Sequence, residues 1–244
     1  MAVIQTCFRR YEKKYLLTPE QQEFILRGAR GHMKEDDYGR YTICNIYYDT
    51  EDYSLIRASL DKPVYKEKLR VRSYGVPQPQ DGVFVELKKK VDGVVYKRRV
   101  RLAAGLAPRY LAGDLSLSPG GQISREIEWF QRFYRTEPRV FIGYDRMALA
   151  GTEQRELRMT FDTNLRWRGA ALDLRAGGQG ELLLPPERIL MEIKIPDAAP
   201  LWLGRLLSEA EAYPVSFSKY GLCYREHIAG GRPDIYDKEA LYSA

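Results

Sequence analysis

One stretch of the sequence decides the fold, residues 64–102, which reads VYKEKLRVRSYGVPQPQDGVFVELKKKVDGVVYKRRVRL. Three segments of it alternate charged and apolar side chains: 64–75, 82–91 and 94–102. Because successive side chains of a strand point to opposite faces of a sheet, this period of two predicts three β-strands. A turn rich in Pro and Gln at 76–81 separates the first two strands, and Asp92-Gly93 is a signal for a tight hairpin between the last two.

Each predicted strand carries its charges on one face and apolar residues on the other. The charged faces hold Lys66, Lys68, Arg70 and Arg72, then Glu86, Lys88 and Lys90, then Lys97, Arg99 and Arg101. Three more segments repeat the pattern: Arg10, Glu12 and Lys14 in 8–17, Arg158, Thr160 and Asp162 in 155–164, and Glu192 and Lys194 in 188–195. A sheet with one solvated face explains charges of this kind. Their dominance by Arg and Lys favours a sheet closed around a basic lumen.

The remaining segments complete an α+β fold. Further strands are expected at 41–49 and 138–149, and helices at 18–31, 51–59, 121–135, 198–212 and from about Ser218. Thr18-Pro19-Glu20-Gln21 has the residues of a capping box with proline at the first helical position. We expect an acidic loop at 34–40. The predicted architecture is an antiparallel β-barrel tunnel of about eight strands with helices outside, as a single domain over 1–230, followed by a loose tail at 231–244.

The net charge of +6 is concentrated in one part of the chain. Residues 62–101 contain twelve Lys and Arg against four acids, a net charge of +8, so the other residues together carry −2. A block of this kind suggests an anionic partner, which includes nucleic acid, a membrane surface or a phosphate-rich small molecule.

Composition excludes several classes of protein. Three scattered cysteines, Cys7, Cys44 and Cys223, do not make a disulfide scaffold or a zinc site, and two histidines do not make a multi-histidine centre. The chain has no apolar run near the ~20 residues of a membrane span and no signal-peptide core. We therefore expect a cytoplasmic protein without a transmembrane segment.

A lumen crowded with like charges is costly unless an anion fills it. A polyphosphate would do so, because its many oxygens match the planar donor groups of arginine. Glutamates on the same faces could hold Mn²⁺ or Mg²⁺, which prefer carboxylate and phosphate oxygens.

Short segments spread over nearly the whole chain resemble one known family. They are YEKKYLL (11–17), IYYDT (46–50), KLRVRSYG (68–75), VFVELKKK (83–90), VYKRRV (95–100), YDRMAL (144–149), LRMTFDTNL (157–165), LMEIKI (190–195) and FSKYG (217–221). In order and number they resemble the VTC domain, the catalytic domain of polyphosphate polymerases of the vacuolar transporter chaperone type. That domain belongs to the triphosphate tunnel metalloenzyme, or CYTH-like, superfamily.

The resemblance implies roles for individual residues. It implies catalytic roles for Arg70, Arg72, Arg146, Arg158 and Lys88, phosphate binding by Lys14, Lys97, Ser218 and Lys219, and metal binding by Glu192. The same-face pattern adds Arg99 and Lys194 as phosphate ligands, and Glu86 and Glu12 as further candidates for the metal. The implied reaction transfers the γ-phosphoryl group of ATP to the end of a polyphosphate chain. Related phosphatases open with Glu-x-Glu-x-Lys, whereas this chain has Arg10-x-Glu12-x-Lys14, which favours the polymerase branch.

Three other functions remain open. A tunnel triphosphatase would hydrolyse inorganic triphosphate or nucleotides, and a non-catalytic module would only bind polyphosphate or inositol phosphates. A nucleic-acid binder is disfavoured, because the cations alternate with apolar residues on strands and no DNA- or RNA-reading motif is present.

Asp162 is expected to be the structural partner of an arginine. We expect neither the sensing domain nor the membrane helices of the family's eukaryotic polymerases in this sequence, which leaves a separate membrane partner as an open alternative.

Overall fold

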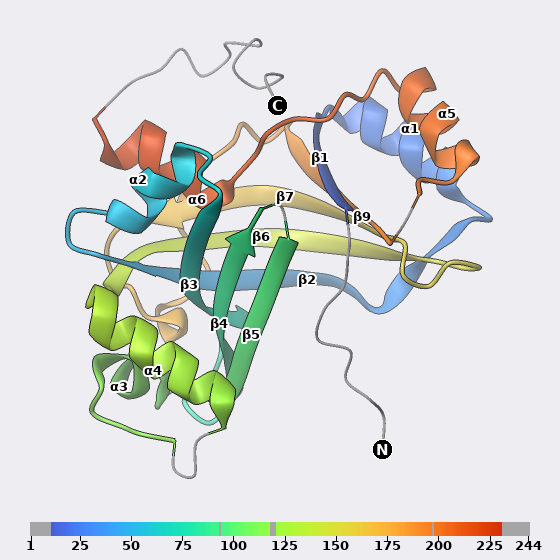
Figure 1. Cartoon of the computed structure of the whole chain (residues 1–244). Coiled ribbons are helices and arrows are strands. Elements are labelled where there is room, and N and C mark those ends of the chain that lie inside the picture. Colours follow the sequence, from blue (N-terminus) through green and yellow to red (C-terminus); the bar gives the residue numbers. More distant parts are fainter. Residues whose placement is uncertain (1–10, 93, 118–120, 197, 231–244) are drawn as a thin grey trace. The chain divides into compact units, whose positions relative to one another are not determined.

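The structure is a computed structural model that describes residues 11–92, 94–117, 121–196 and 198–230. Nine strands form one sheet in the order β1-β9-β7-β6-β2-β3-β4-β5, with β8 paired to β7 (Figure 1). The strands are β1 (Tyr11–Leu17), β2 (Met33–Asp49), β3 (Tyr65–Tyr74), β4 (Gly82–Val91), β5 (Val94–Ala103), β6 (Glu137–Gly151), β7 (Arg158–Arg168), β8 (Glu181–Leu182) and β9 (Ile189–Ile195). The helices are α1 (Pro19–Ala29), α2 (Ser54–Leu60), α3 (Ala107–Ala112), α4 (Gln122–Tyr134), α5 (Leu201–Glu209) and α6 (Lys219–Cys223).

The predicted antiparallel sheet with helices is confirmed, but the predicted closure into a barrel is not. The strand order is open in the described residues, with β1 at one end and β5 at the other. A closed tunnel therefore stays a prediction.

The contacts within the chain divide it into two compact units. The first takes its described residues from Met1–Tyr41, Tyr144–Leu165 and Leu182–Ala244, and the second consists of Thr42–Gly143 and Arg166–Glu181. The long strands β2, β6 and β7 contribute residues to both. The predicted tail at 231–244 lies outside the described residues.

In the first unit, α1 and α5 pack on the apolar face of β1, β9 and β7. The core contains Ile25 of α1, Leu203 of α5, Met191 of β9 and Phe161 of β7, all at most 1% exposed. Gly28 of α1 allows the close approach, because a Cβ there would collide with the side chain of Leu206. The predicted capping box is present, since the Thr18 hydroxyl accepts from the Gln21 amide and the Gln21 side chain accepts from the Thr18 amide.

In the second unit, α3 and α4 cover the apolar face of β3, β4 and β5. Ile127 and Phe130 of α4 pack with Leu69, Val85 and other apolar strand residues, and these four side chains are fully buried. Burial of this face fixes the register of the strands, because a shift of one residue would turn every charged side chain inward. The charged faces predicted for β3, β4 and β5 therefore lie opposite this core.

Most predicted elements are present, and the main differences concern β2 and α3. The acidic loop predicted at 34–40 is wrong, because β2 begins at Met33 and runs through it. Charged residues are tolerated there since pairing of the backbone, rather than side-chain propensity, decides a solvated strand. Helix α3 was not predicted, because six residues carry too little periodicity. The pairing of Val91 with Val94 agrees with the predicted two-residue hairpin, although Gly93 itself lies outside the described residues.

Candidate functional site

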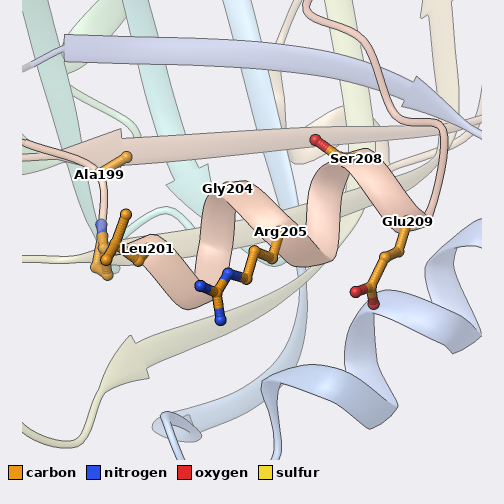
Figure 2. Close-up of a pocket in the computed structure, with 7 residues that line it drawn as sticks. Ala199, Leu201, Gly204, Arg205, Ser208 and Glu209 are labelled. Carbon is orange, nitrogen blue, oxygen red and sulfur yellow. The ribbon is translucent and has the colours of Figure 1, made fainter.

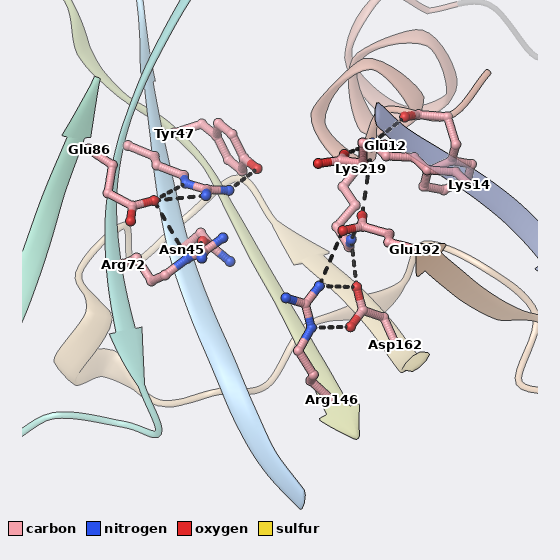
Figure 3. A network of polar contacts seen from close by, with 12 residues as sticks. Glu12, Lys14, Asn45, Tyr47, Arg72, Glu86, Arg146, Asp162, Glu192 and Lys219 are labelled. Atoms are coloured by element: carbon pink, nitrogen blue, oxygen red, sulfur yellow. Dashed lines mark hydrogen bonds and ion pairs between the residues drawn. The ribbon is translucent and has the colours of Figure 1, made fainter. Parts of the chain in front are cut away.

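Most of the predicted site residues belong to two groups of polar contacts, one in each unit. The first group contains Glu12, Lys14, Arg146, Asp162, Glu192 and Lys219, all labelled in Figure 3. The second contains Asn45, Tyr47, Arg72 and Glu86, also labelled in Figure 3, together with Arg70 and Lys97.

Strand register brings the first group together. β9 lies between β1 and β7, so that Lys14, Glu192 and Thr160 stand opposite one another across three strands. Glu12, Lys194 and Arg158 form the next row. Opposed residues in adjacent strands point to the same face. The polar side chains of these two rows therefore share a face, and the core lies on the other.

Asp162 is the buried centre of the first group. Its carboxylate is fully buried and receives two parallel hydrogen bonds from Arg146, Nε to Oδ1 at 2.6 Å and Nη2 to Oδ2 at 2.7 Å. The Lys219 ammonium lies 2.7 Å from Oδ2 of the same carboxylate. The expectation that Asp162 pairs with an arginine is confirmed. It also pairs with Lys219, a contact that strand periodicity does not predict.

Glu192 is the second acid shared by these cations. Its Oε1 lies 2.9 Å from Lys219 Nζ and 3.9 Å from Lys14 Nζ, and its Oε2 lies 3.5 Å from Arg146 Nη2. Burial alone would raise the pKa of Glu192, but Lys219, Lys14 and Arg146 hold it well below its usual value. Glu192 is therefore a carboxylate at every pH at which the protein is expected to work.

Contacts with the backbone position Lys14 and Lys219 of the first group. Lys14 donates to the Phe217 carbonyl at 2.8 Å and lies 3.5 Å from Glu12. Ser218 is the N-cap of α6, where its hydroxyl accepts from the Gly221 amide, and this places Lys219 at the first position of the helix. The Lys219 ammonium also lies over the Tyr144 ring, 4.5 Å from its centroid.

The second group is built on the charged faces of β3, β4 and β5. Rows of opposed residues cross these strands: Arg70 with Glu86 and Arg99, Lys68 with Lys88 and Lys97, and Lys66 with Lys90. Glu86 is the one acid in these rows. This part of the sheet therefore has a large excess of positive charge, as its sequence predicts.

Glu86 is buried, 2% exposed, and three cations converge on it. Arg70 donates to Oε2 through Nε at 2.9 Å and Nη2 at 2.8 Å, Arg72 Nε lies 3.8 Å from the same oxygen, and Lys97 pairs with Oε1. Burial alone would raise the pKa of Glu86, but the three cations lower it to about 2. Glu86 thus stays ionised and holds the cations in place.

Two residues that were not predicted complete the second group. Asn45 is fully buried, accepts from Arg72 Nε at 3.0 Å and donates to the Ile142 carbonyl at 3.0 Å. The Tyr47 hydroxyl accepts from Arg70 Nη1 at 3.2 Å. Both stand opposite the arginine that they contact in the register of β2 and β3. The sequence signal was available, since Asn45 is a polar residue in an apolar strand and shares its phase with Tyr47.

Other predicted phosphate ligands lie beside these groups. Lys88 is exposed opposite Lys97, and the Arg99 guanidinium lies 4.9 Å from the centroid of the Phe84 ring. Arg158 is exposed and Lys194 is half-buried. Their phosphate-binding roles stay predictions.

The neighbours of the three predicted metal ligands decide whether these carboxylates could hold a metal ion. In the described part of the chain no three Asp, Glu, His or Cys side chains are arranged to hold a metal ion. Three cations contact Glu86 and three others contact Glu192, so on either residue a metal ion would have to share the carboxylate with them. Glu86 also belongs to a different unit from Glu12 and Glu192. The oxygens of Glu12 and Glu192 are the donor type that Mg²⁺ and Mn²⁺ prefer, and such ions commonly take one or two carboxylates and complete their shell with phosphates. These two residues fit a metal only together with a phosphate ligand.

A separate surface pocket lies along α5. It is lined by Ala199, Pro200, Leu201, Gly204, Arg205, Ser208 and Glu209, and Figure 2 shows Ala199 just before the helix and the labelled residues from Leu201 to Glu209 on it. Its lining carries one positive and one negative side chain. It therefore offers no excess positive charge to a phosphate and is not part of the candidate site.

The profile of the VTC domain family matches residues 9–227. The chain belongs to the VTC domain family. This confirms the resemblance drawn from the sequence. A search of curated proteins finds no match.

Solved structures show likeness in fold. A proposed adenylyl cyclase from Hippeastrum, reported to have a dominant triphosphatase activity, matches with a TM-score of 0.50 and 15% identity, over 86% of this chain and 93% of that one. A proposed adenylate cyclase from Vibrio parahaemolyticus matches with a TM-score of 0.48 and 11% identity, over 89% of this chain and 98% of that one. In the part of this VTC-family chain that the structure describes, no helix has the length and apolar character needed to cross a membrane.

Proposed function

We propose that this protein is an ATP-dependent polyphosphate polymerase, which transfers the γ-phosphoryl group of ATP to a polyphosphate end and releases ADP. The observation that carries the proposal is the convergence of Arg70, Arg72 and Lys97 on Glu86 in a chain of the VTC family. One buried acid orients three cations, so the face keeps net positive charge in a fixed arrangement. Phosphoryl transfer needs positioning and charge stabilisation more than covalent chemistry.

The arginines would bind the phosphates through their planar donor groups. Arg70 and Arg72 are already held by Glu86, Tyr47 and Asn45, so little reorganisation accompanies binding. Arg146 and Lys219, oriented by Asp162, would act in the same way in the first unit. The nucleophile is a terminal phosphate oxygen that is largely ionised near neutral pH, so the reaction requires no histidine base.

Glu192 and Glu12 would hold Mn²⁺ or Mg²⁺ together with phosphate oxygens. A bound divalent ion would neutralise charge on the transferring phosphoryl group. In the protein itself, the three cations around Glu192 keep its carboxylate ionised, which is the state in which it would bind a metal ion.

The product of the reaction tests the proposal. Incubation with ATP and Mn²⁺ should give ADP and a ladder of long polyphosphates on a gel. ADP and orthophosphate without any polyphosphate would replace the proposal by a triphosphatase, the activity reported for the Hippeastrum protein. Tight polyphosphate binding without ADP release, unchanged by Glu192→Ala, would indicate a binding module.

Lys97 should make phosphate binding depend on pH. Partial removal from water lowers the pKa of Lys97, and the nearby Arg72 and Arg70 lower it further. The carboxylate of Glu86 opposes this decrease, and the resulting pKa is about 8. Lys97 is therefore charged at pH 7 and loses its charge as the pH rises above 8. We expect affinity for inorganic tripolyphosphate, measured by calorimetry, to fall about tenfold between pH 7 and 9, the size of one charged hydrogen bond.

The matched control for this prediction is Lys97→Arg, which keeps the positive charge throughout this range. Its affinity should change much less between pH 7 and 9. The same decrease in wild type and variant would show that Lys97 is not responsible.

A further inference from the structure

The charged face of the second unit ends in aromatic residues. Along β3 the residues on this face run from Lys66 through Arg70 and Arg72 to Tyr74, and along β4 they run from Lys90 to Phe84. The positive rows thus give way to two aromatic rings at one end. The polymerase hypothesis does not by itself assign these rings a role.

Tyr74 and Phe84 form an edge-to-face aromatic pair in which Tyr74 is the more exposed residue. The ring centroids are 6.1 Å apart with an interplanar angle of 82°, and Tyr74 is 54% exposed. Ile43 stands opposite Tyr74 on β2 and is 1% exposed, so it adds a buried apolar neighbour but no open surface. Tyr74 and Phe84, on two adjacent strands, therefore form a small aromatic platform.

Arginines border this platform. Arg72 stands opposite Phe84, and Arg99 lies over the Phe84 ring at 4.9 Å. On β5, Arg101 also stands opposite Phe84, and its side chain lies against Gly82, where a Cβ would not fit. A ligand in contact with both parts of the face would carry an aromatic group at one end and negative charge at the other.

We infer that Tyr74 and Phe84 bind the base of a nucleoside triphosphate whose phosphates lie over the arginine rows, an inference that rests on the proposed phosphate site. Side chains two residues apart on a strand are about 7 Å apart. A base on Tyr74 therefore places the phosphates, one sugar away, above Arg72 and Arg70. Bases stack readily on aromatic side chains because every base has a π-face.

Two ligands distinguish binding of the base from binding of the phosphates. A non-hydrolysable ATP analogue carries both, and inorganic tripolyphosphate carries only the phosphates. By calorimetry, Tyr74→Ala should weaken binding of the analogue about tenfold and leave binding of tripolyphosphate unchanged.

The controls distinguish stacking from a structural role. Tyr74→Phe keeps the ring and should bind the analogue about as tightly as wild type, as should Tyr65→Ala, which removes an exposed tyrosine at the other end of β3. Equal weakening of both ligands by Tyr74→Ala would overturn the inference, and so would unchanged binding of the analogue. If wild-type protein binds neither ligand, the proposed function fails with it.

Discussion

Replacement of Asp162 by asparagine is expected to lower the free energy of unfolding by about 3–5 kcal/mol. The carboxylate is fully buried and forms contacts of 2.6–2.7 Å with Arg146 and Lys219. Asparagine has nearly the same shape but no charge, so both cations would remain buried with only Glu192 as a charged partner. The loss is large because uncompensated charge stays in the protein.

Urea unfolding followed by circular dichroism measures this effect. Asp52→Asn is the matched control, because Asp52 pairs with Arg57 at 3.5 Å while both side chains are more than half exposed. Exposed ion pairs contribute little. The control should therefore leave the unfolding midpoint near that of wild type. Similar shifts in the two variants would contradict the placement of Asp162 at a buried ionic centre.

The asparagine variant should also lose activity in the fraction that stays folded. The parallel hydrogen bonds from Arg146 to Asp162 fix the plane of the guanidinium. Without these hydrogen bonds, the Arg146 guanidinium would become oriented only when the phosphate binds, which would weaken its interaction with the phosphate. In the wild-type protein the guanidinium is already oriented in the folded state. Turnover per folded molecule, measured below the unfolding transition, separates this effect from the loss of stability.

Much of the fold could be predicted because its signal is local. Alternation along β3, β4 and β5 gives the strands and identifies the charged face, and the predicted β4 has the observed bounds, Gly82–Val91. The capping residues predict the start of α1. The loop expected at 34–40 was wrong because its charged residues give no pattern, while strand pairing there depends on residues far away in the sequence.

The site could be predicted less completely, because strand periodicity identifies a face and not the contacts on it. It placed Arg70 and Glu86 on a common side, but it could not show that Asn45 holds Arg72, since β2 and β3 pair through tertiary structure. Nor could it show that Lys219, far along the chain, shares Asp162 with Arg146. Long-range pairing selects the partners, and periodicity alone does not contain that information.

The largest effect on activity is expected from Arg70→Ala. Arg70 uses Nε and Nη2 on Glu86 and Nη1 on Tyr47, so its guanidinium is fixed before any ligand arrives. Loss of one preorganised charged donor typically costs 10²–10³-fold in turnover, and we expect a decrease of about this size in the rate of ADP release. Arg158→Ala should likewise reduce turnover.

The fold should survive Arg70→Ala, because Arg72 and Lys97 still compensate the buried Glu86. Arg70→Lys separates charge from geometry. It keeps the charge but cannot form the planar contacts to Glu86 and Tyr47, so its turnover should lie between those of Arg70→Ala and wild type. Arg132→Ala, which removes an arginine from the exposed side of α4, is the matched control and should retain full activity. Turnover of Arg70→Ala within a few-fold of that of Arg132→Ala, with both proteins folded, would remove Arg70 from the catalytic site. In that case the positive face of the second unit would no longer support the polymerase hypothesis.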